Sequence, residues 1–477
     1  MSNNFKTIEV FEGPRYETNA QSNVVKSPIV NIKGFNKNNK EINIALNEDL
    51  LSKHVLIIGG IGMGKTNTFK SIVQQTSDSL KRNDVMLIFD TKGDFYNEFG
   101  NEDDILISNT PIKASNGTYA EPRFSDTWNI FAELNDAKLT ETSNEIASMM
   151  FNSHVKNSSQ SFFPLAAKSI FAAVLRAIYR VHTGKAGLMK LKTEPSNKLL
   201  KDFFNGENIF AGVDESARKS DTLKNIVGLL NLVKEERGAL GYISTANKEG
   251  AVDGQTLGVL AELRLVIDEL FVGNFAKEGS FSITNAVRTR GAKRIFIEYD
   301  ITEGEVLSPI YSLLVDLAIK ESLDSRSTQK GSNAYFIIDE FKLLPHLKHM
   351  DDAVNFGRSL GVKFVIGVQN VSQIIENYGR NGAMNILSGF LTTFAFKVSD
   401  YETRNYLINL FGTNRKKTAY LSSITTRGVS ESLGFGRVVE DWDIAALDIG
   451  ECIVHLAKND SDPYNSPFFL HTTLFNE

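Results

Sequence analysis

The sequence is poor in cysteine and has no long apolar run. Its 477 residues include one cysteine, Cys452, which excludes an intramolecular disulfide and any metal site built from several cysteines. No stretch approaches the roughly 18 uninterrupted apolar residues of a membrane span, and the nearest, residues 169–179, contains Arg176. The N-terminal residues have no apolar core of signal-peptide length. The sequence therefore predicts a cytoplasmic protein without direct membrane insertion, in which residues 169–179 form a core helix.

The chain also lacks an excess of positive charge. Its formal net charge is −5, whereas a protein that binds nucleic acid over its whole surface is usually basic. Any contact with DNA would therefore need positive groups gathered in a groove or pore. One basic run, Arg415-Lys416-Lys417, fits either a pore lining or a solvated face. The histidines are scattered, and no His, Asp and Glu cluster at metal-ligand spacing indicates a built-in nuclease.

The apolar pattern predicts a doubly wound α/β fold. Apolar runs of strand length recur along the chain with amphipathic helices between them, which is the order of a parallel sheet. The predicted buried strands are the run HVLIIGG from residue 54 and residues 84–90, 294–300, 334–339, 362–368 and 389–398. Helices are predicted at about residues 65–80, 304–323 and 349–360.

Two other parts of the chain differ from this alternation. Residues 27–46 read as two strands joined by a turn-rich stretch. From about 135 to 250 the strand signal disappears, and apolar residues recur at helical spacing. The predicted segments are a β-rich N-terminal segment (1–50), the first part of the core (51–135), an all-α insertion (136–255) and the second part of the core (256–477).

A phosphate-binding loop is predicted at residues 59–66, GGIGMGKT, which fit G-x-x-x-x-G-K-[ST] between a buried strand and a helix. The glycines let backbone N–H groups surround phosphate oxygens. Lys65 would place its charge against the β- and γ-phosphates, and the Thr66 hydroxyl would bind Mg²⁺. The predicted nucleotide-binding residues are Gly59, Gly60, Ile61, Gly62, Met63, Gly64, Lys65, Thr66 and Asn67, with ATP and Mg²⁺ as the expected cofactors.

Two acids follow the predicted strand at residues 334–339. Asp339 lies at the carboxyl end of this strand, where it would hold Mg²⁺ through water. Glu340 would polarise the attacking water. A P-loop protein that only binds nucleotide often lacks the second acid, so the pair favours hydrolysis.

Polar residues flank the predicted strand at 362–368. Gln369 follows it and would lie at the edge of the sheet that carries the phosphate loop, where it would sense the γ-phosphate or orient water. Arg358 precedes the strand, and seven residues at ~3.3 Å each separate the two edges by about 23 Å. Because an arginine side chain cannot span that distance, Arg358 either packs locally or stabilises the phosphoryl group bound by a neighbouring subunit.

Several of these motifs resemble those of the type IV secretion coupling proteins, the conjugative DNA-transfer ATPases of the HerA/FtsK superfamily. Shorter stretches, Asp90 to Asp94 and residues 126–131, resemble family motifs with small departures at Thr91, Asp94 and Ile130. The motifs that carry the resemblance are Asp339-Glu340-Phe341, Leu344-Pro345, Arg358 with Gly361, Gln369, and Gln373 to Tyr378-Gly379.

The resemblance covers roughly residues 50–460. It implies a RecA-like P-loop NTPase core and a homohexameric ring that moves DNA through its centre using ATP. It also implies that Lys65, Asp339, Glu340, Gln369 and Arg358 are the catalytic residues, with Arg358 acting across the subunit interface, and that Thr66 and Asp339 bind the metal.

Three interpretations remain open at this point. Coupling proteins usually begin with membrane-spanning helices, and none is found here, so one is a coupling protein recruited by secretion or relaxosome partners. Another is a HerA-like cytoplasmic ATPase working with a nuclease or other effector in repair or phage defence. The last is a nucleotide-gated scaffold that does not move DNA. A metabolic kinase and an ABC transporter subunit are disfavoured by the position of Arg358 and by the absence of a Leu-Ser-Gly-Gly-Gln-type signature.

Overall fold

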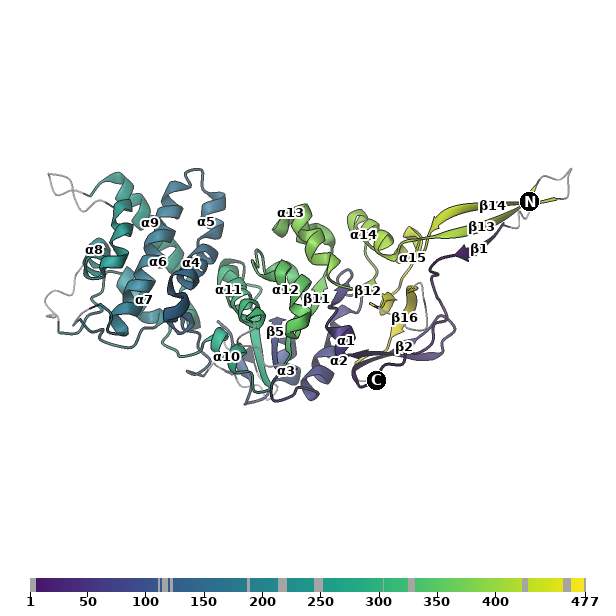
Figure 1. Ribbon diagram of the computed structural model, residues 1–477, viewed down its shortest axis with the longest axis horizontal. Coiled ribbons are helices and arrows are strands. Elements are labelled where there is room, and N and C mark those ends of the chain that lie inside the picture. Colours follow the sequence, from purple (N-terminus) through teal and green to yellow (C-terminus); the bar gives the residue numbers. More distant parts are fainter. Residues whose placement is uncertain are drawn as a thin grey trace. The chain divides into compact units, whose positions relative to one another are not determined.

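The structure is a computed structural model (Figure 1). Its chain separates into two compact units. The first unit comprises residues 1–89, 328–342 and 348–477, and the second comprises residues 90–327 and 343–347. The residues described are 6–109, 112–113, 119–120, 123–186, 189–212, 221–243, 252–302, 304–324, 331–422, 428–457 and 465–475.

A mostly parallel sheet forms the centre of the first unit. The full strand order of the sheet is β3-β2-β16-β15-β12-β4-β11-β10-β5-β9-β6, and the five strands from β12 to β5 are parallel to one another. Every residue of these five strands is buried, which explains their continuous apolar runs, because a parallel sheet is covered on both faces. Their bounds are β4 Val55–Ile58, β5 Val85–Thr91, β10 Ala334–Ile338, β11 Val362–Val368 and β12 Thr392–Phe396. The predicted α/β class is confirmed.

The N-terminal strands extend this sheet rather than forming a segment of their own. β2 pairs with β16 and β3 pairs with β2, all antiparallel, and β15 joins β16 to β12. The Gln75 amide also bonds both the N–H and the carbonyl of Asn31, which ties β2 to the helix behind it. The bounds are β2 Pro28–Phe35, β3 Glu41–Asn47, β15 Glu451–His455 and β16 Phe468–Thr472.

Helices connect the strands of the first unit. They begin where the sequence offers a cap: the Asn370 and Asp400 side chains accept from the N–H groups of Gln373 and Thr403. The elements are α1 Glu48–Leu51, α2 Lys65–Asp78, α12 Met350–Phe356, η7 Gly357–Leu360, α13 Val371–Ser388, α14 Tyr401–Phe411 and α15 Asp441–Ala445, with η6 Phe341–Leu343 after β10.

A separate three-stranded antiparallel sheet joins the beginning of the described chain to a late hairpin. β13 (Thr413–Ser422) pairs with both β1 (Lys6–Glu12) and β14 (Gly428–Arg437), and Figure 1 shows the hairpin beside β1. β1 falls inside the predicted β-rich N-terminal segment, whereas the hairpin of β13 and β14 was not predicted. The pairing of β1 with β13 joins residues about 400 positions apart in the chain, which a local pattern does not reveal.

The second unit contains a bundle of helices around α6. Phe171 of α6 packs against the rings of Phe151 and Phe204, with ring centroids 5.5 and 6.0 Å away. Among the described residues α6 is the one helix long and apolar enough to cross a membrane, yet most of it is buried, as in a core helix. The bundle consists of α4 Leu139–Met150, α5 Asn152–Asn157, α6 Phe162–His182, α7 Asn197–Phe204, α8 Thr222–Leu232, η4 Lys234–Tyr242 and α9 Gly254–Leu270.

The rest of the second unit is mixed. β6 and β9 form a parallel pair, and α10 packs on α11. The elements are α3 Asp94–Phe99, β6 Ile105–Ile107, β7 Ile112–Lys113, β8 Tyr119–Ala120, η1 Ile130–Glu133, η2 Asp136–Lys138, η5 Gly273–Ala276, α10 Ile283–Thr289, β9 Lys293–Tyr299 and α11 Gly304–Leu323.

The unit boundaries differ from the predicted segments. The predicted end of the insertion at residue 255 falls at the start of α9, which packs against α6 and α7, so the helical bundle extends to Leu270. Residues 90–135 and 256–327 lie in the second unit rather than with the phosphate loop. The apolar periodicity of the sequence indicates where helices lie, but it does not show that the buried face of α9 packs in this bundle.

Candidate functional site

The phosphate loop lies between β4 and α2 of the first unit. Gly62 and Gly64 adopt φ values of 74° and 108°, the left-handed region that favours glycine. A Cβ on Gly64 would also lie 3.2 Å from Cα of Gly450. Gly64 is the N-cap of α2 and no side chain caps it, so the first N–H groups of this helix remain available for an anion.

The loop is anchored to two neighbouring strands. The Gly59 N–H donates to the Val368 carbonyl at the end of β11, at 3.1 Å. The Gly60 N–H donates to the Lys397 carbonyl just beyond β12, at 2.8 Å. Because both bonds are made at the carboxyl ends of parallel strands, the loop sits at the edge of the sheet where α/β proteins bind ligands.

Lys65 is folded back over its own loop. Its Nζ donates to the carbonyls of Gly59 and Gly60, at 2.6 and 3.0 Å, and the residue is 9% exposed. Burial lowers the pKa of Lys65, while the nearby charges of Glu340 and Asp339 act in the opposite direction. The ammonium group therefore lies among the acids predicted to share its site.

The acid pair and Gln369 meet at the same edge. β10 and β11 are parallel neighbours in which Ile338 pairs with Ile366, so the residues that follow each strand are adjacent. Gln369 Nε2 donates to Glu340 Oε2 at 2.5 Å. A Cβ on Gly367 would lie 1.9 Å from the Asp339 carbonyl oxygen, so a glycine is needed there for the two strand ends to approach.

The remaining loop residues have different surroundings. Thr66 and Ile61 are exposed, and Ile61 reaches 80% exposure. The Asn67 amide donates to the Thr473 carbonyl, and its oxygen accepts from the Phe475 N–H, both at 2.6 Å. The side chain of Asn67, predicted to bind nucleotide, is thus engaged with the C-terminal segment.

Arg358 lies at the opposite edge of the sheet, in the turn η7 that precedes β11. One of its terminal nitrogens donates to Asp49 Oδ1 at 2.9 Å, and its side chain is 53% exposed. The pKa of Asp49 is lowered mainly by its hydrogen bond with the Lys53 ammonium group, and Arg358 lowers it further. A guanidinium carries five N–H donors, so this single bond orients the group and leaves most of its donors open.

His54 supports the segment that carries Arg358. Its Nδ1 accepts from the Phe364 N–H and its Nε2 bonds the Val354 carbonyl, both at 3.1 Å, so the neutral ring spans the chain on either side of η7. The residue is 1% exposed and has a φ of 58°. The sequence did not reveal Asp49 or His54, because neither belongs to a recognisable motif.

The stability of this unit should depend on His54 below neutral pH. Burial lowers the pKa of His54 to about 4 from 6.5, so its neutral form contributes stability that is full above pH 6.5 and is lost as the pH falls towards 4. The loss is on the order of 3 kcal/mol. Urea unfolding of the first unit should therefore depend less on pH over this range in His54→Asn than in the wild type. An exposed-histidine variant, His182→Asn, should keep the wild-type dependence, and equal pH dependence in all three proteins would contradict this role.

The basic run in β13 is paired with acids. Arg415 contacts Glu12, Lys416 contacts Glu440 and Lys417 contacts Glu431, at 3.1, 3.0 and 2.7 Å. These pairs lower the net positive charge of the strand. Of the two interpretations of this run, a solvated face has the stronger support.

The stretches resembling the shorter family motifs are packed inside the second unit. Asp90 is fully buried and accepts from the Tyr96 N–H at 2.8 Å, and burial raises its pKa to about 7. Trp128 donates from Nε1 to Glu133 at 3.0 Å, and the Asn129 amide donates to the carbonyls of Pro195 and Gly279. These contacts hold loops of the second unit together.

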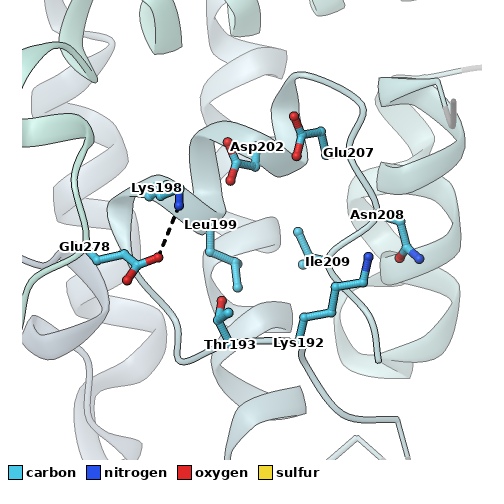
Figure 2. Close-up of a pocket in the computed structure, with 9 residues that line it drawn as sticks. All are labelled: Lys192, Thr193, Lys198, Leu199, Asp202, Glu207, Asn208, Ile209 and Glu278. Carbon is cyan, nitrogen blue, oxygen red and sulfur yellow. Dashed lines mark hydrogen bonds and ion pairs between the residues drawn. The ribbon is translucent and has the colours of Figure 1, made fainter. Parts of the chain in front are cut away.

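A pocket of about 470 Å³ lies in the second unit, at the start of α7 (Figure 2). Its walls carry both signs of charge, and Lys198 is paired with Glu278 at 3.4 Å. It has no glycine-rich turn, so it does not resemble the phosphate loop. The lining residues are Lys192, Thr193, Lys198, Leu199, Asp202, Glu207, Asn208, Ile209 and Glu278.

Solved structures of coupling proteins and of VirB4 share this fold. The bacterial conjugative coupling protein TrwBdeltaN70, in its unbound monoclinic form, is 19% identical with a TM-score of 0.65, over 90% of this chain and 87% of that chain. Plasmid coupling protein TrwB in complex with ADP and Mg²⁺ is 17% identical with a TM-score of 0.64, over 99% and 96%. VirB4 of Thermoanaerobacter pseudethanolicus is 13% identical with a TM-score of 0.50, over 95% and 98%.

Sequence comparisons identify the family. No curated protein matches the chain significantly. The family model described as the type IV secretion-system coupling protein DNA-binding domain matches residues 41–235 and 244–431, which is most of the chain. The family expected from the motifs is thereby confirmed, and the chain belongs to the type IV secretion-system coupling proteins that share this DNA-binding domain.

Proposed function

We propose that this protein is an ATPase of the HerA/FtsK superfamily that assembles into a homohexameric ring in the cytoplasm and uses ATP hydrolysis to move DNA. The observation that carries the proposal is the meeting of Lys65, Glu340 and Gln369 at one edge of the sheet, beside an uncapped helix. The family match favours the coupling-protein interpretation, with DNA as the partner, over a scaffold or a repair enzyme.

The phosphates of ATP would bind at the N-terminus of α2. The uncapped N–H groups of this helix and the ammonium group of Lys65 supply the positive charge. Lys65 now donates to two carbonyls of its own loop, and the negative phosphates would compete for the same donor. This exchange keeps the buried ammonium group hydrogen-bonded in both states.

The residues present fit a magnesium ion beside the bound phosphates. Thr66 offers an exposed hydroxyl at the start of α2, and Asp339 offers a half-buried carboxylate at the end of β10. Hard oxygen donors of this kind, completed by phosphate oxygens and water, are what Mg²⁺ prefers. When bound, the ion would neutralise charge that develops on the phosphates.

Glu340 would accept a proton from the attacking water. Its carboxylate is held by the Gln369 amide, so the Oε2 atom has a fixed direction. Gln369 would also contact the γ-phosphate or the water from the same position and thereby couple the nucleotide state to β11. Arg358 would act in trans, on the nucleotide of the next subunit, because it lies about 23 Å from its own site.

The test is steady-state ATP hydrolysis with and without DNA. We expect single- or double-stranded DNA to raise the rate several-fold, and Lys65→Ala to abolish hydrolysis because the phosphates lose their main cation. Lys70→Ala, which removes a partly exposed lysine from the same helix, is the matched control and should hydrolyse ATP normally. A wild-type rate that neither form of DNA changes would contradict the proposal.

A further inference from the structure

Strand β14 forms an uncovered edge of the three-stranded sheet. Among the described strands it pairs with β13 alone, along its whole length and without a register shift (Figure 1). Natural proteins usually protect such edges with a bulge, a proline or charged side chains, lysine above all, which hinder pairing with another chain. The opposite edge, β1, has such a protection, because its register shifts between Val10 and Glu12. β14 has no bulge, lysine or proline, and its charged residues, Glu431 and Arg437, carry opposite signs, so its outward backbone groups are open to another strand.

One face of β14 exposes large apolar side chains. Leu433 is 55% exposed and Phe435 is 84% exposed, and both lie on the same face because side chains alternate along a strand. Phe11 of β1 adds a third apolar side chain there, at 59% exposure. Its ring lies under the guanidinium of Arg415, the residue of β13 that pairs with Phe435. A single exposed apolar residue is ordinary, but three beside an unprotected edge favour an interaction surface.

The side chains of β14 are complementary to those of a second copy of the same strand. Two β14 strands can run antiparallel with Gly434 opposite Gly434, and each Leu433 then lies opposite the Phe435 of the other copy. In the same register each Glu431 lies opposite an Arg437. A displacement by two residues in either direction places Leu433 opposite itself or opposite Arg437, and it leaves Glu431 without a cation. The charges and the apolar side chains therefore select one register.

The charged residues of this register are available for the contact. Glu431 contacts Lys417 of its own sheet at 2.7 Å, and because its side chain is 53% exposed it can accept from a second cation. Arg437 is exposed, and within the described part of the chain it has no ion pair. A Cβ on Gly434 would meet nothing within 4 Å, so the middle of the strand is open as well. Exposed ion pairs add little affinity, but they fix the register in which two strands meet.

We infer that β14 pairs antiparallel with β14 of a second copy of this chain, about a two-fold axis at Gly434. The three-stranded sheets of the two copies join into one continuous sheet, in which backbone hydrogen bonds supply the affinity and the side chains supply the register. A two-fold contact uses the same surface on both copies, so it closes after two, whereas a ring needs head-to-tail contacts. The pairing is therefore separate from the proposed ring, and it does not use the nucleotide site.

Disulfide cross-linking tests the register. The sole native cysteine, Cys452, is fully buried, and burial raises the pKa of its thiol, so it should not react. Under mild oxidation with copper phenanthroline, Gly434→Cys alone should give dimers on denaturing gels, because directly opposite residues of an antiparallel pair have Cβ atoms about 4.5–5.5 Å apart. Gly238→Cys, at an exposed glycine of the second unit, is the matched control and should stay monomeric. Dimers no more abundant from Gly434→Cys than from this control would overturn the pairing.

Charge reversal gives a second readout. Arg437→Glu alone and Glu431→Arg alone should each raise the dissociation constant of the two-fold contact at least about tenfold, because like charges then lie opposite one another twice. An equal mixture of the two variants should recover the contact, since one copy supplies two carboxylates and the other supplies two guanidinium groups. Arg380→Glu reverses an exposed arginine outside this sheet and should pair as the wild type does.

The measurement is sedimentation velocity over a concentration series, in which pairing doubles the mass of the species present, whether that is one chain or a ring. Single variants that pair as the wild type does, or a mixture that does not recover, would overturn the inference. A wild type that never doubles in mass, with no disulfide from Gly434→Cys, would mean that β14 stays unpaired or serves another partner, and would overturn it too. None of these results bears on the proposed function, because the substitutions lie outside the nucleotide site.

Discussion

Glu340→Gln should lower kcat for ATP hydrolysis by about 10²–10⁴-fold while leaving ATP binding close to that of the wild type. The substitution removes the carboxylate that would take the proton from water but changes the side chain little in size. The amide oxygen of a glutamine can still accept from Gln369 Nε2, so the local geometry should persist. A loss of turnover without a loss of binding would identify Glu340 as a group that acts in the chemical step.

The measurement is single-turnover hydrolysis together with equilibrium binding of an ATP analogue. Glu376→Gln removes an exposed carboxylate from the neighbouring α13 and is the matched control, with an expected wild-type rate. If Glu340→Gln keeps more than about a tenth of the wild-type kcat, another group or water must take the proton, and the assignment from the Asp339-Glu340 pair is wrong.

Arg358→Ala should lower kcat by about 10³-fold or more, the range typical of an arginine supplied in trans. The chain itself places Arg358 at the far edge of the sheet from Lys65, so the loss cannot come from removing a group of the same site. Arg380→Ala, which removes a more exposed arginine that pairs with Glu402, should change the rate little.

Mixing two inactive variants separates a trans role from a structural one. Where an Arg358→Ala subunit sits beside a Lys65→Ala subunit, the intact phosphate loop of the first meets the intact arginine of the second. In an equal mixture about a quarter of the junctions combine the two in this way, so partial activity should return. If the mixture stays inactive although mixed rings form, Arg358 is a local partner of Asp49 only.

The sequence predicted those parts of the fold whose signal is local. β11 is observed at residues 362–368, as expected, because a strand buried on both faces is a continuous apolar run. The helix predicted from Lys65 ends two residues early, at Asp78. The meeting of Glu340 with Gln369 followed from the rule that parallel strands end at one edge.

Other parts depend on contacts between distant segments. β1 and β13 pair along residues such as Glu12 and Arg415, which lie about 400 positions apart and form an ion pair, and no apolar period marks β13. The motif predicts that Asn67, near the start of α2, binds nucleotide. Its side chain instead forms hydrogen bonds with the backbone of Thr473 and Phe475 in the C-terminal segment. The partners of such side chains are set by tertiary contacts, which a local motif does not encode.

The most direct measurement is displacement of streptavidin from biotinylated DNA, with single- and double-stranded substrates and the biotin at either end. The wild type should displace streptavidin from at least one substrate in an ATP-dependent reaction, and Glu340→Gln should not, because movement requires hydrolysis at this site. A wild type that hydrolyses ATP in the presence of DNA but displaces streptavidin from no substrate would contradict the assignment of this protein as a DNA motor.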